Sequence, residues 1–316
     1  MKIVVTPRGF AKCGLENAQV MRAAGFDVDY NATGLAYTKE DFYRVTEDAD
    51  GVIVGVETVD RAYIDAHPKL KAVVKFGVGT DNIDLEHCKQ KGIFVGRTVG
   101  SNARTVAETA ISFVIADSKN LFDSISNTRN HGWNKMTGYE IQGRTIGIIG
   151  FGLAGKHYAE LLRPFAVDVI AYDPGVSAEA MAEIGVRKAT LEEVFAQSDV
   201  LSLHAPELPS TRHIVNRETL ASMKDGAILI NTARGSLVDE EALVEALESG
   251  KLRYAAIDVV SQEPMKSDNP LLKTRKCIIT PHIAWAPVES RQRLMDCVEE
   301  NIRAYLMGQP QNVVNM

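Results

Sequence analysis

The sequence predicts an α/β protein with two doubly wound parallel-sheet domains. Short β-branched runs alternate with amphipathic helical stretches from end to end, which is typical of parallel sheets covered by helices. The strand-like runs are apolar throughout, as expected for strands buried on both faces. The length of 316 residues exceeds what one hydrophobic core usually serves, so we expect two domains.

The first third of the chain reads as one small doubly wound domain. Helical stretches near residues 15–24 and 62–66 separate its strand-like runs. A single long helix is expected over residues 288–306, and it could cross back to this domain. We therefore expect a discontinuous domain made of residues 1–98 and 286–316. Its expected strands are residues 2–7, 27–30, 51–55, 72–77 and 93–96.

Residues 99–285 are expected to form the second, larger domain. It begins with mostly helical sequence and the irregular stretch NHGWNKMTGYEIQG, which we interpret as a connection and an oligomer surface. Thr190 and Glu193 form a capping box that opens a helix, and a later helix is opened by Asp239 and closed by Gly250. The expected strands are residues 144–150, 167–173, 186–190, 199–205, 227–233, 254–260 and 277–281.

Composition and charge argue against several classes of function. The net charge is −6 and Lys and Arg are mixed with acidic residues, so no nucleic-acid partner is expected. No run approaches the ~18 apolar residues of a membrane span, and the N-terminus lacks the apolar core of a signal peptide, so we expect a cytoplasmic protein. The cysteines form no CxxC or metal-ligand pattern, so no metal or disulfide framework is expected. They are Cys13, Cys88, Cys277 and Cys297.

A glycine motif in the second domain predicts a dinucleotide site of the Rossmann type. The motif follows the apolar run TIGII and opens an amphipathic helix, which is the context it requires. The next strand ends in Asp173, 18 residues after Gly155, where a carboxylate can bind ribose hydroxyls and repel the extra phosphate of NADP. NAD is therefore the expected cofactor. The cofactor-binding residues of the motif are Gly150, Gly152, Leu153, Ala154 and Gly155.

Three polar residues that follow strands of the second domain could carry chemistry. Arg234 suits a substrate carboxylate through its bidentate fork. His282 suits proton transfer, and the carboxylate of Glu263 could orient and charge its ring. Taken singly, each also has an ordinary structural interpretation as a surface cation, a loop residue or a turn residue, so spacing alone leaves the set undecided.

Several motifs in fixed order resemble the D-isomer-specific 2-hydroxyacid dehydrogenases. They are NTARGSLVDEEALVEAL, AAIDVVSQEP, TPHIAW, the glycine motif and the stretch VVKFGVGTDNIDLEHCKQKGIFVGRTVGSNARTVAE, which together run from about residue 70 to the C-terminus. The resemblance implies a Rossmann cofactor domain inserted into a flavodoxin-like catalytic domain. It also implies that Arg234 binds substrate, that His282 is the acid/base and that Glu263 holds the imidazole.

The same resemblance assigns further contacts. Gly77, Val78 and Gly79 would bind the substrate carboxylate through backbone amides. It also implies a homodimer built through the helical segment after Asn102. The remaining cofactor contacts would come from Val106 where the cofactor cleft closes, from His204 and Pro206 near adenosine, from Ala233 near the nicotinamide half, from Asp258 near the carboxamide, and from His282.

The substrate is the open question. Lys75, Arg8 and Lys12 lie in loops of the first domain and could bind a phosphate, or could equally be solvated surface cations. The motifs resemble both phosphoglycerate dehydrogenase and hydroxypyruvate reductase members of the family. Glycerate, hydroxypyruvate, glyoxylate or another 2-keto acid therefore compete with 3-phosphoglycerate. Because the sequence ends at Met316, we expect no C-terminal regulatory domain.

Two rival functions remain. A non-catalytic NAD-sensing binding protein could retain the fold and the triad, although the sequence carries no long appended tail for partners. Formate dehydrogenases resemble this chain too, but that branch pairs its histidine with glutamine, whereas Glu263 stands in SQEP here.

Overall fold

The chain forms two compact units in the computed structural model, which describes residues 1–315. Unit 1 comprises Met1–Asn102 and Pro287–Met316, and unit 2 comprises Ala103–Ala286. The sequence placed the first boundary after residue 98 and the second after residue 285. In the structure, unit 1 extends to Asn102 and resumes at Pro287. Residues 99–102 belong to unit 1 because the Ser101 carbonyl accepts hydrogen bonds from Ser290 and Arg293 of the C-terminal helix.

Unit 1 contains a five-stranded parallel sheet in the order β2-β1-β3-β4-β5. This is the flavodoxin-like order, so the fold expected for this part of the chain is confirmed. Its strands are β1 (Lys2–Val5), β2 (Asp27–Tyr30), β3 (Gly51–Val54), β4 (Ala72–Lys75) and β5 (Phe94–Gly96). Its helices are α1 (Phe10–Cys13), α2 (Leu15–Ala23), α3 (Lys39–Thr46), α4 (Arg61–Ala66), α5 (Leu85–Gln90) and α13 (Val288–Leu306).

Helix α13 brings the end of the chain back to unit 1. It covers Val288–Leu306, the bounds expected from its sequence pattern. Ile302 on this helix is fully buried, and a Cβ placed on Gly51 of β3 would lie only 2.9 Å from its Cδ1 atom. The glycine at the start of β3 therefore lets the helix pack closely on the sheet.

Unit 2 contains a seven-stranded parallel sheet in the order β12-β11-β10-β9-β6-β7-β8. Numbered within the unit, six of its strands have the Rossmann order 3-2-1-4-5-6, with β12 as an added edge strand. The strands are β6 (Thr145–Ile149), β7 (Asp168–Tyr172), β8 (Arg187–Lys188), β9 (Val200–Leu203), β10 (Ala227–Asn231), β11 (Leu252–Ile257) and β12 (Cys277–Ile279). The helices are α6 (Ala103–Ser118), α7 (Leu121–Arg129), α8 (Leu153–Leu162), α9 (Ala178–Ala182), α10 (Leu191–Gln197), α11 (Arg217–Ser222) and α12 (Glu240–Glu248), with 3-10 turns at Arg163–Phe165, Gly235–Leu237 and Pro270–Lys273.

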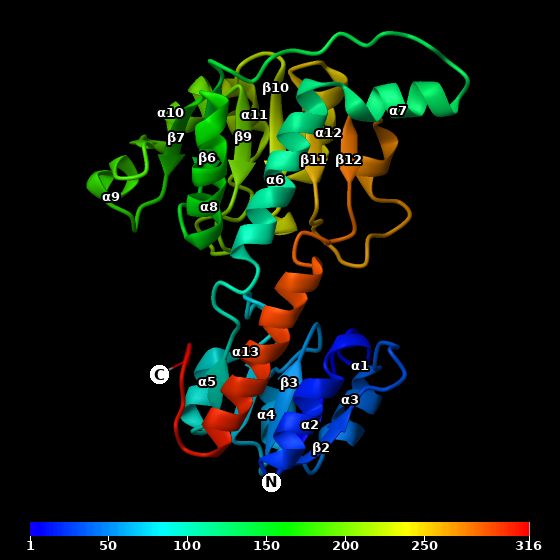
Figure 1. The fold of residues 1–316 in the computed structure, drawn as a ribbon, viewed down its shortest axis with the longest axis vertical. Coiled ribbons are helices and arrows are strands. Elements are labelled where there is room, and N and C mark those ends of the chain that lie inside the picture. Colours follow the sequence, from blue (N-terminus) through cyan, green and yellow to red (C-terminus); the bar gives the residue numbers. More distant parts are fainter. Residues whose placement is uncertain (316) are drawn as a thin grey trace. The chain divides into compact units, whose positions relative to one another are not determined.

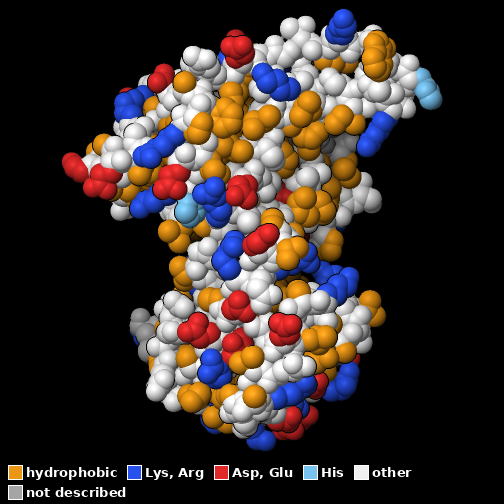
Figure 2. All heavy atoms as spheres, in the orientation of Figure 1, with side chains coloured by type: hydrophobic (Ala, Val, Ile, Leu, Met, Phe, Trp, Pro, Cys, Tyr) orange, Lys and Arg blue, Asp and Glu red, His pale blue; other side chains and the backbone are white. Residues whose placement is uncertain are grey.

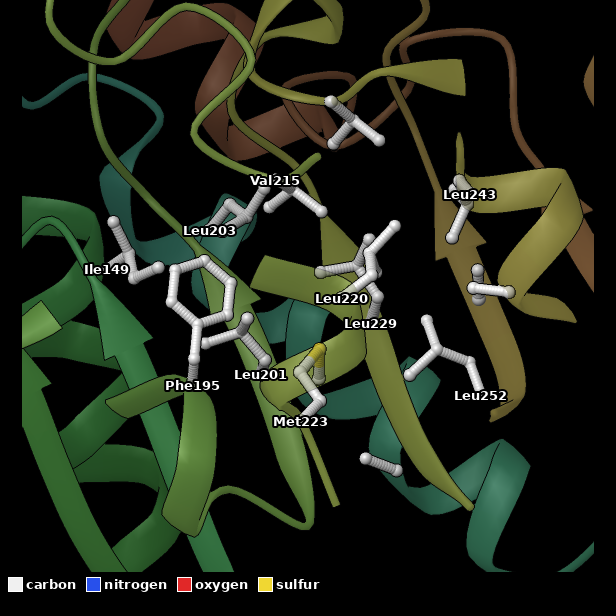
Figure 3. Close-up of a cluster of buried hydrophobic side chains, with 14 of the residues drawn as sticks. Ile149, Phe195, Leu201, Leu203, Val215, Leu220, Met223, Leu229, Leu243 and Leu252 are labelled. Carbon is white, nitrogen blue, oxygen red and sulfur yellow. The ribbon is translucent and has the colours of Figure 1, made fainter. Parts of the chain in front are cut away.

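Helices cover both faces of this second sheet, as a doubly wound fold requires. On one face, Phe113 of α6 and Tyr158 of α8 pack against the strands. On the other face, Phe195, Leu220 and Leu243 from α10, α11 and α12 pack against the buried strand residues, as Figure 3 shows. Both faces of the strands are thus apolar and buried, which explains their continuous apolar runs.

The helix ends predicted from local sequence are confirmed. Thr190 and Glu193 form a reciprocal capping box at the start of α10. The Asp239 side chain accepts the backbone N–H of Ala242 at the start of α12, and Gly250 follows this helix with a φ of +80°. These short-range hydrogen bonds depend on neighbouring residues only, so the sequence could predict them.

The helical segment after Asn102 is not continuous. Asn120 adopts a left-handed conformation, with a φ of 47°, and divides the segment into α6 and α7. Helix α6 packs along α8, whereas α7 buries none of its residues and projects from the rest of unit 2 (Figure 1). Asn tolerates this conformation better than most residues, which explains the position of the break.

Two surface properties bear on possible partners. Across residues 1–315, no helix combines the length and the apolar character that crossing a membrane would demand. On the face drawn in Figure 2, basic and acidic side chains are interspersed.

Candidate active site

Gly150 and Gly155, at the turn between β6 and α8, are positions where the surrounding backbone leaves no room for a Cβ atom. Gly150 has a φ of +94°, and a Cβ at this position would lie 2.4 Å from the backbone nitrogen of Ala205. A Cβ at Gly155 would lie 2.3 Å from the carbonyl oxygen of Gly150. The turn therefore fits tightly against the segment after β9, and α8 fits tightly against the turn.

Gly152 differs from Gly150 and Gly155, because neither its backbone conformation nor the space around it requires glycine. Its φ is −72°, and among residues 1–315 no atom lies within 4 Å of a Cβ built there. Gly152 is the N-cap of α8, and no side chain caps this end of the helix. Leu153 is exposed and Ala154 is half-buried in the first turn. This open, uncapped helix end fits the pyrophosphate of a dinucleotide, which accepts hydrogen bonds from such N–H groups.

Asp173 is placed beside the same turn. It follows β7, and its Oδ2 atom accepts the backbone N–H of Phe151 at 2.7 Å, while Oδ1 accepts that of Gly175 at 2.8 Å. The carboxylate is therefore fixed at the edge of the open space, and each oxygen keeps a second lone pair for a ribose hydroxyl. The residues present fit NAD.

The backbone of His204 packs against the glycine turn that follows β6. It follows β9, its backbone carbon lies 2.6 Å from the Cβ position of Gly150, and its Nε2 atom lies 2.9 Å from the Ser202 hydroxyl. Burial lowers the pKa of His204 to about 4, so the imidazole is neutral at pH 7. Its ring lies beside that of Tyr158, with ring centroids 5.0 Å apart, and its contact with NAD stays a prediction.

The other expected cofactor residues lie around this edge of unit 2. Pro206 is exposed in the loop after β9, and Ala233 is half-buried after β10 and packs against the core. Val106 lies in the first turn of α6, the helix that packs along α8. Their contacts with NAD remain predictions.

Glu263 and His282 are brought together as the sequence predicted. The Nδ1 atom of His282 lies 2.7 Å from Oε2 of Glu263, although 19 residues separate them. Burial tends to raise the pKa of Glu263, but the hydrogen bond and charge of His282, the Val260 N–H and the charge of Arg234 together hold it below its usual range. Glu263 is therefore ionised and can only accept, so His282 donates its Nδ1–H and keeps Nε2 for chemistry.

Asp258 positions the loop that carries His282. Its side chain is 1% exposed, and it accepts the Thr280 hydroxyl at 2.5 Å and the N–H groups of Ile283 and Ala284 at 2.9 Å each. His282 itself has a φ of +53°, which this clamp maintains. The sequence singled out Asp258 as a cofactor residue and did not reveal its role as a clamp, because the three donors are fixed by tertiary structure.

Arg234 is held at the end of β10 by its neighbours. The Asn231 side chain donates to the Arg234 carbonyl at 2.8 Å and accepts the Ala233 N–H at 3.0 Å. A Cβ at Gly235 would lie 2.0 Å from the carbonyl carbon of Val260, so the turn after Arg234 touches the segment that leads to Glu263. Sequence reasoning missed Asn231 and Gly235, although both stand in the motif NTARGS that drew attention to Arg234.

The proposed carboxylate loop lies in unit 1, after β4. Gly77 has a φ of +145°, which favours glycine, and its carbonyl accepts the N–H of Thr98 at 3.0 Å. Val78 and Gly79 are half-buried in the same loop. Among residues 1–315, no group of three or more His, Cys, Asp or Glu side chains is arranged to hold a metal ion.

Of the three cations that could bind a phosphate, Lys75 is anchored within unit 1. Its ammonium donates to the Gly55 carbonyl at 2.5 Å and to the Asn82 side-chain oxygen at 2.6 Å. Arg8 and Lys12 are exposed in the loop and helix that follow β1.

Comparisons with known proteins agree with this geometry. The family model described as "D-isomer specific 2-hydroxyacid dehydrogenase, NAD binding domain" matches residues 111–284, which is more than half of the chain. A hydroxypyruvate reductase of Blautia hydrogenotrophica is 36% identical over 323 residues, covering 100% of both chains.

Two further similarities extend the comparison. A D-3-phosphoglycerate dehydrogenase of Methanocaldococcus jannaschii is 39% identical over 290 residues, covering 90% of this chain and 55% of the relative, so the chain spans about half of that protein's length. The solved structure of an NAD-dependent formate dehydrogenase from Staphylococcus aureus in complex with NAD superposes with a TM-score of 0.88 at 28% identity, covering 99% of both chains.

The family resemblance and the NAD cofactor predicted from the sequence are confirmed. The chain therefore belongs to the D-isomer specific 2-hydroxyacid dehydrogenase family and is an NAD-dependent oxidoreductase that acts on a CH–OH group.

Proposed function

We propose that the protein interconverts a small 2-keto acid and its D-2-hydroxy acid, with hydroxypyruvate and D-glycerate as the first candidates. The observation that carries this proposal is the Glu263–His282 pair, which stands with Arg234 at the carboxyl ends of the strands of the NAD-binding unit. Hydroxypyruvate is favoured because the hydroxypyruvate reductase of Blautia hydrogenotrophica matches this chain over its full length.

Each residue of the triad has a separate task in keto acid reduction. Arg234 binds the substrate carboxylate through its bidentate guanidinium group. NADH, when bound, supplies the hydride for the carbonyl carbon. His282 delivers the proton from Nε2 to the carbonyl oxygen, and the Glu263 carboxylate stabilises the protonated imidazole that this transfer needs. In the opposite direction, Nε2 takes the proton from the hydroxyl group.

A panel of keto acids tests this function. Purified protein is mixed with NADH and, separately, with hydroxypyruvate, glyoxylate, pyruvate, 2-oxoglutarate and phosphohydroxypyruvate. We expect NADH oxidation, with the highest kcat/KM on hydroxypyruvate. If NADH binds but the whole panel is silent, the protein is a non-catalytic NAD-binding protein instead.

We also propose that the protein is a homodimer that assembles through α7 and the stretch after it. Helix α7 buries none of its residues within the chain, and Ile125 on it is 48% exposed. Trp133 in the following stretch is 84% exposed. Apolar side chains gathered on one projecting element are typical of a surface that another protein chain covers.

We propose the cytoplasm as the site of action. The four cysteines are free thiols, which suits a reducing compartment.

A further inference from the structure

The loop that carries Glu263 spans residues 258–269, between β11 and the 3-10 turn Pro270–Lys273. The Glu263 side chain is 38% exposed, and the hydrogen bond that it accepts from the Val260 N–H is long, at 3.3 Å. Its carboxylate nevertheless lies 2.7 Å from Nδ1 of His282. Contacts elsewhere in the loop must therefore fix its course.

One side chain of α12 binds both ends of this loop. Glu240 is the first residue of α12, and its Oε1 atom accepts the backbone N–H of Ser261 at 2.6 Å. Its Oε2 atom accepts a side-chain N–H of Asn269 at 2.9 Å. Glu263 lies between these two partners in the sequence. A single carboxylate thus closes the segment that contains Glu263 into a loop.

The far end of the loop is anchored in the core of unit 2. Asn269 is 8% exposed, and its Oδ1 atom accepts the N–H of Leu271 at 2.9 Å. Leu271 is 1% exposed and belongs to the same buried cluster as Leu243 of α12. Asn269 is therefore a fixed donor, and its bond to Glu240 ties the loop to a well-packed part of the unit.

The near end of the loop adjoins the turn that carries Arg234. Gly235 follows Arg234, and a Cβ placed on Gly235 would lie 2.4 Å from the backbone nitrogen of Ser261. The N–H of this same nitrogen is the group that Glu240 accepts. The Glu240 carboxylate therefore holds the start of the loop against the turn after Arg234, two residues before Glu263.

We propose that Glu240 is a positioning residue for the reaction, which ties both ends of the loop and so keeps Glu263 at Nδ1 of His282. This inference rests on the proposed function, because it gives Glu240 a part in the protonation of His282. An ionised carboxylate suits this task, since its two oxygens can accept two N–H groups and charged acceptors form stronger hydrogen bonds than neutral ones. Glu240 acts only through Glu263.

Two substitutions of Glu240 grade the loss of this hold. Glu240→Ala removes both hydrogen bonds. Glu240→Gln keeps one of them, because the amide has a single acceptor oxygen and its NH2 group cannot accept from the second donor. The matched control is Glu241→Ala, since Glu241 is the next residue in the same turn of α12, carries the same charge and is exposed.

Steady-state reduction of hydroxypyruvate by NADH measures the effect on the reaction. We expect kcat to fall about 10²-fold in Glu240→Ala, as a small displacement of a catalytic group can produce, and to fall less in Glu240→Gln. The rate of Glu240→Ala should also decline at a lower pH than that of the wild type, because the imidazole loses its carboxylate partner. NADH affinity, measured by fluorescence titration, should be retained, and Glu241→Ala should match the wild type throughout.

The pH profile distinguishes positioning from a merely structural role. A general loss of stability would lower the melting temperature of Glu240→Ala but leave the pH dependence of its rate unchanged. An unchanged pH profile in Glu240→Ala, or an equal change in Glu241→Ala, therefore overturns the proposal.

A double variant tests whether Glu240 acts through Glu263. In Glu263→Gln the loop no longer delivers a carboxylate to His282, so adding Glu240→Ala should lower kcat by less than about 3-fold more. A further loss of about 10²-fold would show that the two residues act independently, and it would overturn the proposal.

Limited proteolysis tests the hold on the loop without any turnover. Lys266 is exposed and is the only Lys or Arg between Ser261 and Asn269, so trypsin can cut this part of the loop only there. We expect cleavage after Lys266, followed by mass spectrometry, to be about 10-fold faster in Glu240→Ala than in the wild type or in Glu241→Ala. Equal cleavage in Glu240→Ala and the wild type overturns this inference alone. Full activity of His282→Ala overturns the proposed function, and the cleavage rate then still decides whether Glu240 holds the loop.

Discussion

The Glu263 carboxylate decides which nitrogen of His282 can do chemistry. Its oxygen lies 2.7 Å from Nδ1, so the proton on Nδ1 is held in this hydrogen bond and Nε2 is the nitrogen left for proton transfer. The sequence could predict the pair because NTARGS, SQEP and TPH stand at the ends of successive strands, and parallel strands deliver their carboxyl ends to one edge. The clamp by Asp258 could not be predicted, because its three donors lie 22 to 26 residues away in sequence and only the tertiary structure brings them to the carboxylate.

Replacing His282 with Ala should remove the proton donor without disturbing the dinucleotide site. We expect kcat for keto acid reduction to fall by about 10²–10⁴-fold, the usual contribution of a general acid. NADH affinity, measured by fluorescence titration, should be retained. His157→Ala is the control, since His157 is a surface residue of α8 that pairs with Glu160. Full activity of His282→Ala would remove this histidine from the mechanism.

Replacing Glu263 with Gln should change the pH profile of the reaction. The ionised carboxylate favours the protonated imidazole, so its loss should make keto acid reduction decline at a lower pH than in the wild type. The rate of reduction between pH 5 and 9 is the measurement. An unchanged alkaline limb would show that Glu263 does not charge His282.

The same variant has a predicted effect on stability. The pKa of Glu263 is lower in the folded protein than its ordinary value, so its ionised form stabilises the fold above the ordinary glutamate pKa of about 4.3. This contribution should disappear as the pH falls through the folded-state pKa. Thermal melts of wild type and Glu263→Gln should therefore differ at pH 7 and converge in acid.

At the scale of elements, the turn between β6 and α8 contains a glycine that close packing requires and another that the protein's own packing does not require. Gly155 is required by the close approach of the Gly150 carbonyl, whereas Gly152 borders open space at the helix end. The motif itself predicts these different roles, with Gly152 allowing a pyrophosphate to approach the backbone and Gly155 allowing close helix packing. The coordinates add which backbone atom a Cβ at Gly155 would touch.

Single alanine substitutions at Gly152 and Gly155 should have different effects on stability and on NAD binding. Gly155→Ala forces a Cβ to within 2.3 Å of a backbone oxygen and should lower the free energy of unfolding by about 1–3 kcal/mol without NAD. Gly152→Ala should leave that stability unchanged and weaken NAD binding, because its Cβ enters the space proposed for the pyrophosphate. Thermal melts with and without NAD measure both effects. Equal NAD affinity of Gly152→Ala and the wild type would place the pyrophosphate elsewhere.

Element positions were predictable where the signal is local or strongly periodic. The bounds of α13 and the capping of α10 and α12 followed from residue spacing alone. The break between α6 and α7 was not foreseen, since residues on both sides of Asn120 suit a helix and only its backbone conformation shows the interruption.

At the scale of the whole molecule, each unit buries its own sheet, whereas α7 has no fully buried residue and contacts the core of unit 2 through the half-buried Phe122. If α7 is the dimer contact, Ile125→Glu should place a charge in that interface and yield a monomer. Val20→Glu is a matched control on α2, because Val20 is 46% exposed and Ile125 is 48% exposed. Sedimentation velocity distinguishes the two. A dimer that persists in Ile125→Glu would place the interface on another surface.

The discontinuity of the first unit was predictable because a long helix follows the last strand of the second sheet. The exact boundaries were not, because the turn residues Gly100, Ser101 and Asn102 mark a connection without showing which unit holds it. The hydrogen bonds from Ser290 and Arg293 of α13 to the Ser101 carbonyl, which tie this turn to unit 1, depend on tertiary structure. The identity of the substrate could not be predicted from the sequence, because the catalytic motifs fix the reaction class and not the group attached to the hydroxy acid.

The most direct test of the whole account is the configuration of the product formed from hydroxypyruvate and NADH. Chiral chromatography of the glycerate should show the D isomer alone, formed in step with NADH oxidation by the wild type and lost in His282→Ala. Formation of L-glycerate, or D-glycerate produced at the wild-type rate by His282→Ala, would contradict the assignment of Arg234, Glu263 and His282.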